Sequence, residues 1–183
     1  MTLCKKIIVL ITIFYVSQIV SQQETYKIFN SENGLSNTNI IKITQDNIGY
    51  LWLGTDRGLI RFDGDDFTRV NSKKITSLLF NNKKLLVGTT KGLIVKEGNQ
   101  EVFYESKKVF NVIIKDTDVF VATNQGICHL KNKKLLPIQI NTKLDFSIIY
   151  DIVYANNSFF IASNNGLYQI DDFYSIHKMH GLD

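Results

Sequence analysis

The residues best suited to chemistry in this sequence are a few glycines, acidic side chains and histidines. The stretch LWLGTDRGLIRFDG (residues 51–64) contains three glycines, which raises the question of a phosphate-binding loop. A dinucleotide loop requires G-x-G-x-x-G between a strand and a helix, and a P-loop requires G-x-x-x-x-G-K followed by Ser or Thr. Neither spacing occurs here, and the residues that follow Gly58 have a strand pattern. We therefore expect no phosphate site in this stretch.

The acidic cluster and the histidine pair lack the ligands that a metal ion needs. Asp63, Asp65 and Asp66 lie together, but an EF-hand loop requires further oxygen ligands and a terminal Glu. These three residues are expected to form a turn. His177 and His180 are three residues apart and would bind a metal only with a third ligand.

Two further reactive side chains are expected to have structural roles. His129 lies on a repeat strand, at the position of Phe62 or Lys96 in the neighbouring copies, and is expected on a strand face. Cys4 lies in the N-terminal segment described below, so Cys128 is alone in the mature chain and is expected to be a buried thiol. We assign no catalytic residue, no metal-binding residue and no cofactor. The ligand-binding residues are left unknown.

The glycine stretch is one copy of a repeat, which must position all of these residues. The copies are centred on residues 51–64, 85–98, 119–132 and 159–172. Each copy has three apolar residues, then Gly or Ala, Thr or Ser, two polar residues, Gly and an apolar pair. The second glycines are separated by 34, 34 and 40 residues: Gly58, Gly92, Gly126 and Gly166. A period of this size indicates a solenoid, a propeller or an array.

Each copy predicts four short strands joined by tight turns. In the first copy the strands are expected at residues 39–46, 51–55, 58–63 and 67–70. Gly54 is expected to let a neighbouring sheet approach, Thr55 to satisfy backbone groups of the turn, and Gly58 to have a positive φ. The turn pair Asp56–Arg57 shares no chemistry with the pairs at the same place in the other copies, so it is expected to have no specific role; those pairs are Thr90–Lys91, Asn124–Gln125 and Asn164–Asn165.

These features predict an all-β chain. Repeated four-stranded units are the blades of a β-propeller, whereas leucine-rich and helical repeats would show a leucine ladder or amphipathic helices. We expect a β-propeller of four-stranded antiparallel blades over residues 23–183, with about four blades present as an incomplete, open arc.

The first 22 residues form a separate segment. A short basic start is followed by 14 mostly apolar residues (7–20) and then by polar residues, the order found in a secretory signal. The apolar run is shorter than the approximately 20 residues of a membrane-spanning helix. We predict a cleaved signal peptide at residues 1–22 and an exported protein. The alternatives are an uncleaved membrane anchor and a buried N-terminal helix.

The charge distribution does not indicate a nucleic-acid partner. The net charge is +4, and the lysines occur as pairs at predicted turns, at residues 73–74, 83–84, 107–108 and 133–134. A nucleic-acid binder would show a basic stripe with aromatic residues for stacking. Paired lysines at turns keep the edges of sheets soluble.

Residues 34–67 resemble the two-component regulator propeller repeat. The family pattern has a GLS start, a strand ending near QD, a Gly turn, LW-x-GT, GL and an aromatic-Asp-Gly close, and each of these is present. The later copies depart from the pattern, because they lose the Asp-Gly close and replace Trp52 by Leu86, Phe120 and Phe160. The resemblance covers roughly residues 25–183.

The resemblance implies a periplasmic, ligand-sensing propeller of a two-component signalling receptor that detects a carbohydrate-derived ligand. In the full-length protein a histidine kinase would follow, and the repeats here leave no room for it, so we expect no enzymatic activity from this chain. The alternatives are a secreted propeller enzyme, such as a polysaccharide lyase or glycosidase, and a partner-binding propeller. Expected partners are an oligosaccharide or another small ligand, the downstream blades and signalling domains, and a second copy in a homodimer.

The two ends of the sequence bear on closure of the propeller. Residues 180–183 (HGLD) resemble residues 33–36 (NGLS), where the first repeat opens, so we expect another blade to follow. A propeller closes by pairing its first and last segments, and residues 25–30 would be the first of these. Without later blades, two sheet faces stay open, and the isolated fragment is expected to aggregate or to oligomerise.

Overall fold

The computed structural model describes residues 26–124, 126–139, 148–172 and 174–179. They form one short 3-10 helix, η1 (Ser31–Asn33), and sixteen strands. The first four strands are β1 (Ile40–Gln45), β2 (Leu51–Thr55), β3 (Gly58–Phe62) and β4 (Phe67–Asn71). The next four are β5 (Ile75–Asn81), β6 (Lys84–Thr89), β7 (Gly92–Glu97) and β8 (Gln100–Glu105). They are followed by β9 (Val109–Lys115), β10 (Asp118–Thr123), β11 (Gly126–Lys131) and β12 (Lys134–Pro137). The last are β13 (Ile149–Ala155), β14 (Ser158–Ser163), β15 (Gly166–Asp171) and β16 (Ile176–Met179).

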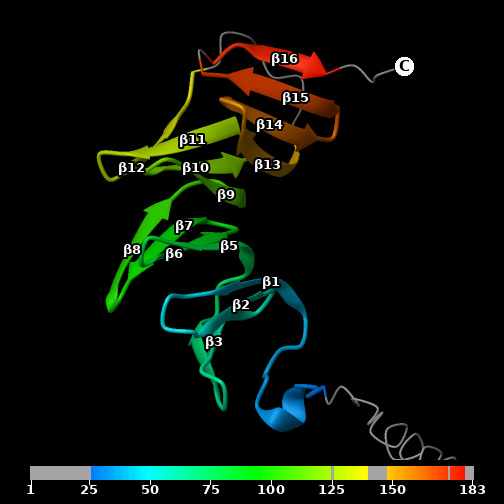
Figure 1. The fold of residues 1–183 in the computed structure, drawn as a ribbon, viewed down its shortest axis with the longest axis vertical. Helices are drawn as coiled ribbons and strands as arrows, with labels where there is room; N and C mark the ends of the chain where they lie inside the picture. Colours follow the sequence, from blue (N-terminus) through cyan, green and yellow to red (C-terminus); the bar gives the residue numbers. More distant parts are fainter. Residues whose placement is uncertain (1–25, 125, 140–147, 173, 180–183) are drawn as a thin grey trace, which may run out of the picture.

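Each set of four consecutive strands forms one antiparallel sheet in chain order. The four sheets are stacked face to face along the long axis of the molecule, with the first and the fourth at opposite ends (Figure 1). The first strands of successive sheets, β1, β5, β9 and β13, are neighbours, as they are around the axis of a propeller. The predicted four-stranded antiparallel blades are confirmed, and the described strands form no closed sheet.

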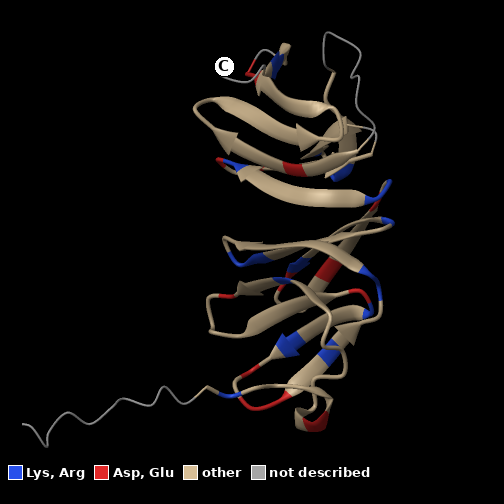
Figure 2. Ribbon diagram, turned by 90° about the vertical axis from the view of Figure 1, so that its right-hand side faces the viewer, with Lys and Arg blue, Asp and Glu red and all other residues tan. Residues whose placement is uncertain are grey.

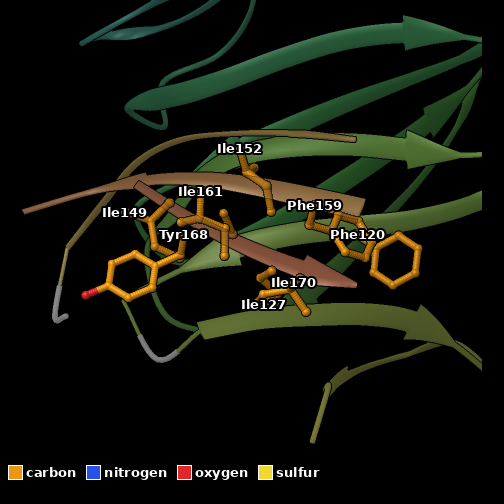
Figure 3. Close-up of a cluster of buried hydrophobic side chains, with 9 residues drawn as sticks. Phe120, Ile127, Ile149, Ile152, Phe159, Ile161, Tyr168 and Ile170 are labelled. Carbon is orange, nitrogen blue, oxygen red and sulfur yellow. The ribbon is translucent and has the colours of Figure 1, made fainter. Parts of the chain in front are cut away.

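Apolar side chains fill the space between neighbouring sheets. Between the third and fourth sheets, Phe120 and Ile127 pack against Phe159, Ile161 and Ile170 (Figure 3). Each of these side chains is at most 3% exposed, and burying one stabilises the fold by about 1.5–3 kcal/mol. Lys, Arg, Asp and Glu lie mostly at turns and strand ends (Figure 2). Face-to-face burial of apolar residues therefore holds the stack together.

A small residue on the second strand of each sheet permits this close stacking. A Cβ atom at Gly54 would lie 2.6 Å from Cγ2 of Ile75 on the next sheet. Gly88 and Ala122 occupy the same position in the second and third sheets, opposite Ser77 and Asn111 of the adjacent strand. The predicted role of this small residue is confirmed.

The segment before the first blade does not form the strand expected at residues 25–30. Residues 26–30 are not part of a strand; instead Phe29 packs edge-on against Phe62 and Phe67, with ring centroids 5.0 and 5.3 Å apart. Leu35 is 3% exposed and joins the same cluster on the outer face of the first sheet. One of the two faces expected to stay open is therefore partly covered, because an aromatic residue of the entry segment folds back onto it.

The predicted signal peptide or anchor at residues 1–22 lies outside the described residues. Within the described part of the chain, no helix combines the length and apolar composition that crossing a membrane requires.

Candidate functional site

The turn between the second and third strands of each blade has the same hydrogen bonds in all four copies. The last residue of the second strand in each blade has a side-chain hydroxyl that donates to the carbonyl oxygen of the repeating glycine at 2.8 to 2.9 Å. These residues are Thr55, Thr89, Thr123 and Ser163. In the first copy the hydroxyl oxygen of Thr55 also accepts the backbone N–H of Arg57 at 3.1 Å. The predicted role of the hydroxyl is confirmed, and the contact is part of the frame of the repeat.

Asp56 has a specific role that the sequence interpretation missed. Its Oδ1 accepts a hydrogen bond from Nδ2 of Asn37 at 2.6 Å, and its Oδ2 accepts one from Nδ2 of Asn39 at 3.2 Å. The turn pair was predicted to have no role, and for Asp56 this was wrong. The reason is that the GLSNTN segment, which enters β1, lies beside the turn. Its two asparagines are the signal that would have indicated the contact.

These hydrogen bonds make the first turn sensitive to acid. The amides of Asn37 and, second, Asn39 lower the pKa of the Asp56 carboxyl from its ordinary value of 3.8. A lowered pKa in the folded state stabilises the fold above the ordinary value, and that stabilisation is lost as the pH falls through the lowered pKa.

We expect Asp56→Ala to reduce the acid dependence of unfolding. The difference in urea midpoint between wild type and variant should be largest near neutral pH and should shrink as the pH falls below 3.8, the ordinary pKa of the carboxyl. Asp65→Ala is the matched control, since the Asp65 carboxylate accepts no hydrogen bond within the described residues. A pH-independent difference for Asp56→Ala would contradict the assignment.

Asp46 organises the other end of the first blade. Its Oδ1 accepts the backbone N–H groups of Ile48 and Tyr50 at 3.0 and 2.9 Å, and its Oδ2 accepts Nε1–H of Trp52 at 2.8 Å. Trp52 is 7% exposed and packs against Ile75 of the next sheet. The QD-x-x-G-x-LW pattern is thus one hydrogen-bonded unit, and its tryptophan is a core residue.

We expect Asp46→Ala to lower the free energy of unfolding by about 2 kcal/mol, because three donors lose a charged acceptor. Asn47→Ala is the control on the same turn and should change it by less than about 0.5 kcal/mol. Urea denaturation followed by far-UV circular dichroism measures both. Equal losses for the two variants would show that Asp46 does not organise this turn.

A row of polar side chains crosses the innermost strands of three blades. Oγ of Ser77 on β5 donates to Oδ1 of Asn111 on β9 at 2.9 Å, and Nδ2 of Asn111 donates to Oδ1 of Asp151 on β13. The three residues lie at one level of successive blades, because each pairs with the small residue on the second strand of its own sheet: Gly88, Ala122 and Ala162. Sequence analysis missed this row, because the residue types differ from blade to blade.

The acidic and thiol residues singled out in the sequence have structural partners. Oδ1 of Asp63 accepts the backbone N–H groups of Asp66 and Asp65 at 2.8 and 3.1 Å, which confirms the predicted turn. These two hydrogen bonds lower the pKa of the Asp63 carboxyl. Cys128 is buried, as predicted, and burial raises the pKa of its thiol. Among the described residues no group of three potential metal ligands occurs.

The histidines are not brought together as a site. His177 lies on β16, whereas His180 is outside the described residues. His129 pairs with Phe120 across the strands, as Arg61 pairs with Trp52. It therefore occupies the position of Arg61, and the predicted alignment with Phe62 or Lys96 was wrong by one residue. The imidazole stacks on Phe120 with centroids 4.5 Å apart, so it is a face residue as expected.

The four stacked sheets and the motif of the first blade define the class of this protein: a β-propeller assembled from degenerate repeats. Residues 34–57 match the family model described as the two-component regulator propeller, which confirms the resemblance. Among curated proteins, histidine kinase P4 of Formosa agariphila is 46% identical over 55 residues, which are 29% of this chain and 4% of that protein. The chain therefore spans a small part of the length of the curated relative that it matches.

Solved structures share the fold at low sequence identity. The extracellular domain of BT3049 from B. thetaiotaomicron, described as a hybrid two component system, has a TM-score of 0.75 and 19% identity. The match covers 84% of this chain and 26% of that one. An ancestral GH74 enzyme has a TM-score of 0.66 and 15% identity, and the match covers 82% of this chain and 27% of the enzyme. Because a signalling domain and an enzyme both share the fold, the fold alone does not define the activity.

Proposed function

We propose that this chain is the ligand-sensing propeller portion of an exported two-component signalling receptor. The observation that supports the proposal is the match of residues 34–57 to the two-component regulator propeller, whose motif residues form the hydrogen-bonded unit around Asp46 and Trp52. In this proposal the propeller lies in the periplasm of a membrane-attached receptor and detects a carbohydrate-derived ligand. It passes the signal to a histidine kinase or another output module outside this chain.

The distribution of carboxylates favours binding over glycoside hydrolysis. The four innermost strands, which face the propeller axis, contain one carboxylate, Asp151. Glycosidases in their usual form use two. Oδ1 of Asp151 already accepts hydrogen bonds from Nδ2 of Asn111 and from the backbone N–H of Ile152. The inner strands thus provide polar groups for recognition and no acid–base pair.

The proposal includes macromolecular partners. Further blades and signalling domains of the same full-length protein would contact the open end of the stack, and a second receptor copy would form a homodimer. No nucleic acid is expected to bind through this region.

A binding and turnover assay tests the sensor proposal against the enzyme alternative. The purified chain is incubated with a panel of defined oligosaccharides, and binding is measured by calorimetry while new reducing ends are measured in the same samples. Binding without new reducing ends or unsaturated products supports the sensor. Cleavage of a bound oligosaccharide would overturn the proposal in favour of a secreted enzyme, and absence of binding across the panel would count against a carbohydrate-derived ligand.

A further inference from the structure

A groove of about 500 Å³ lies between the first and second sheets, a volume typical of small-molecule sites. It lies at the turns that join β1 to β2 and β7 to β8, at the opposite end of the sheets from the Thr55 to Gly58 turn. Its floor is apolar and includes Trp52, Phe80 and Leu85. The groove is separate from the hydrogen-bonded row on the inner strands.

The groove has a small excess of basic over acidic side chains. Arg61, Lys83 and Lys96 line it, together with two acidic residues. Both oxygens of one of these, Asp46, are occupied by backbone and indole N–H groups. The other, Glu97, lies 3.8 Å from Lys84. The three basic side chains form no ion pair within the described residues.

Arg61 lies over the ring of Tyr50, and one of its nitrogen atoms has no hydrogen-bond acceptor among the described residues. Its guanidinium carbon lies 4.6 Å from the centre of the Tyr50 ring. Its Nε atom is buried and has no hydrogen-bond partner among the described residues. Arg61 is half-buried overall and lines the groove, so the terminal N–H groups of its guanidinium are the donors that an anionic group bound there would meet. The planar fork of arginine suits carboxylate and other oxyanions.

The other repeats show that the fold does not require these side chains. The cross-strand pair Trp52–Arg61 corresponds to Leu86–Val95 in the second sheet. The turn at Asp46 to Tyr50 is also longer than the two-residue turn at Asn82–Lys83, which occupies the same place in the second sheet. Because valine satisfies the same frame in the second sheet, the fold does not require an arginine at position 61, and its side chain is available for binding.

We propose that this groove binds an oligosaccharide bearing an anionic group, carboxylate or sulfate, with the anion at Arg61, Lys83 and Lys96. The sugar part of the ligand rests on the proposed function, whereas the requirement for an anion rests on the groove itself. The carboxylate or sulfate accepts hydrogen bonds from the guanidinium, and the two ammonium groups at the rim attract it. The half-buried rings of Tyr50 and Phe80 are the apolar surfaces of the groove against which the less polar face of a sugar ring would pack.

The only tryptophan of the chain, Trp52, lines the groove and reports binding by its fluorescence. The probes are trigalacturonate, galactose 6-sulfate and neutral α-1,4-galactotriose, titrated into the purified chain. We expect saturable fluorescence changes with one or both anionic probes, binding at least about tenfold weaker for the neutral trisaccharide, and weaker binding at higher salt. The two anionic probes distinguish a carboxylate from a sulfate.

Arg61→Val introduces the residue found at the corresponding position of the second sheet and should weaken anion binding at least about tenfold. Arg57→Val removes an exposed arginine at the opposite end of the same blade and should leave binding unchanged. Should Arg61→Val fail to fold by circular dichroism, the double variant Lys83→Gln, Lys96→Gln decides, since neither lysine forms an ion pair in the described chain.

Equal affinity for neutral and anionic probes, or undiminished anion binding in these variants, would overturn the groove proposal. If the neutral trisaccharide bound as tightly as the anionic probes and was not cleaved, the groove would not require an anion, but the proposal of a carbohydrate sensor would stand. Cleavage of a bound anionic probe would support the groove and count against the sensor. Lack of a fluorescence change with either anionic probe would also refute the groove.

Discussion

Gly58→Val is expected to lower the free energy of unfolding by about 3 kcal/mol, one of the largest effects of any single substitution in this chain. Gly58 has φ of +148°, which L-amino acids rarely adopt, and a Cβ atom there would lie 2.1 Å from the carbonyl oxygen of Asn71. The backbone of β4 would have to move, because no side chain can rotate away. Gly92 has φ of +143° and the corresponding contact with Tyr104 at 2.2 Å, so Gly92→Val should behave alike.

Two controls separate this clash from general effects of the substitution. Gly98 has φ of +56° with nothing within 4 Å of a Cβ atom, and asparagine tolerates that conformation. Gly98→Asn and Lys91→Ala should each change the free energy of unfolding by less than about 0.5 kcal/mol. Urea unfolding followed by Trp52 fluorescence measures all four variants. Similar losses for Gly58→Val and Gly98→Asn would refute the role assigned to the repeating glycine.

The isolated chain should associate in solution through the outer face of its fourth sheet. The apolar residue after the repeating glycine is at most 2% exposed in the first three sheets, at Leu59, Leu93 and Ile127. In the fourth sheet the same position, Leu167, is 42% exposed, and Val153 and Met179 on that sheet are 54% and 43% exposed. Apolar side chains that a following sheet covers elsewhere in the stack are here in contact with water, which favours association.

We expect light scattering to show oligomers for the wild-type chain and a shift towards the monomer for Val153→Lys, Leu167→Lys. Val102→Lys is the control, because Val102 is exposed to a similar extent, 47%, but lies on β8 at the outer edge of the second sheet. A monomeric wild-type chain, or equal association of the two variants, would contradict this assignment of the associating face.

The strands and their turns were predictable because local chemistry determines them. Gly58, Thr55 and the apolar triplet act within a few residues of each other, so their spacing in the sequence is also their spacing in space. The four copies also support one another, since each has the same order of strands and turns with different side chains. For this reason the blade count and the positions of the strands agree with the structure.

The contacts that sequence analysis missed join residues from different units of the chain. Asp56 meets Asn37 and Asn39 only because the entry segment crosses beside the turn. Likewise Asn111 reaches Asp151 only because the third and fourth sheets stack with their inner strands side by side. The position of Phe29 depends on its burial against Phe62, since no strand partner determines it. Such contacts follow from the stacking of sheets, which the repeat pattern alone does not specify.

The hydrogen-bonded row of Ser77, Asn111 and Asp151 has a consequence for the thermodynamics of the stack. At this level the first sheet has Lys42, which makes no hydrogen bond to Ser77 in the described chain. In the nearest-neighbour description of repeat proteins, each junction between units contributes its own coupling free energy. The coupling of the first sheet to the second is then chiefly hydrophobic, through Trp52 and Ile75, whereas the later couplings include polar terms as well. Hydrophobic coupling weakens on cooling. The coupling free energies of the junctions therefore depend unequally on temperature, and the most cold-sensitive junction is the one at the first sheet, which contains the complete motif.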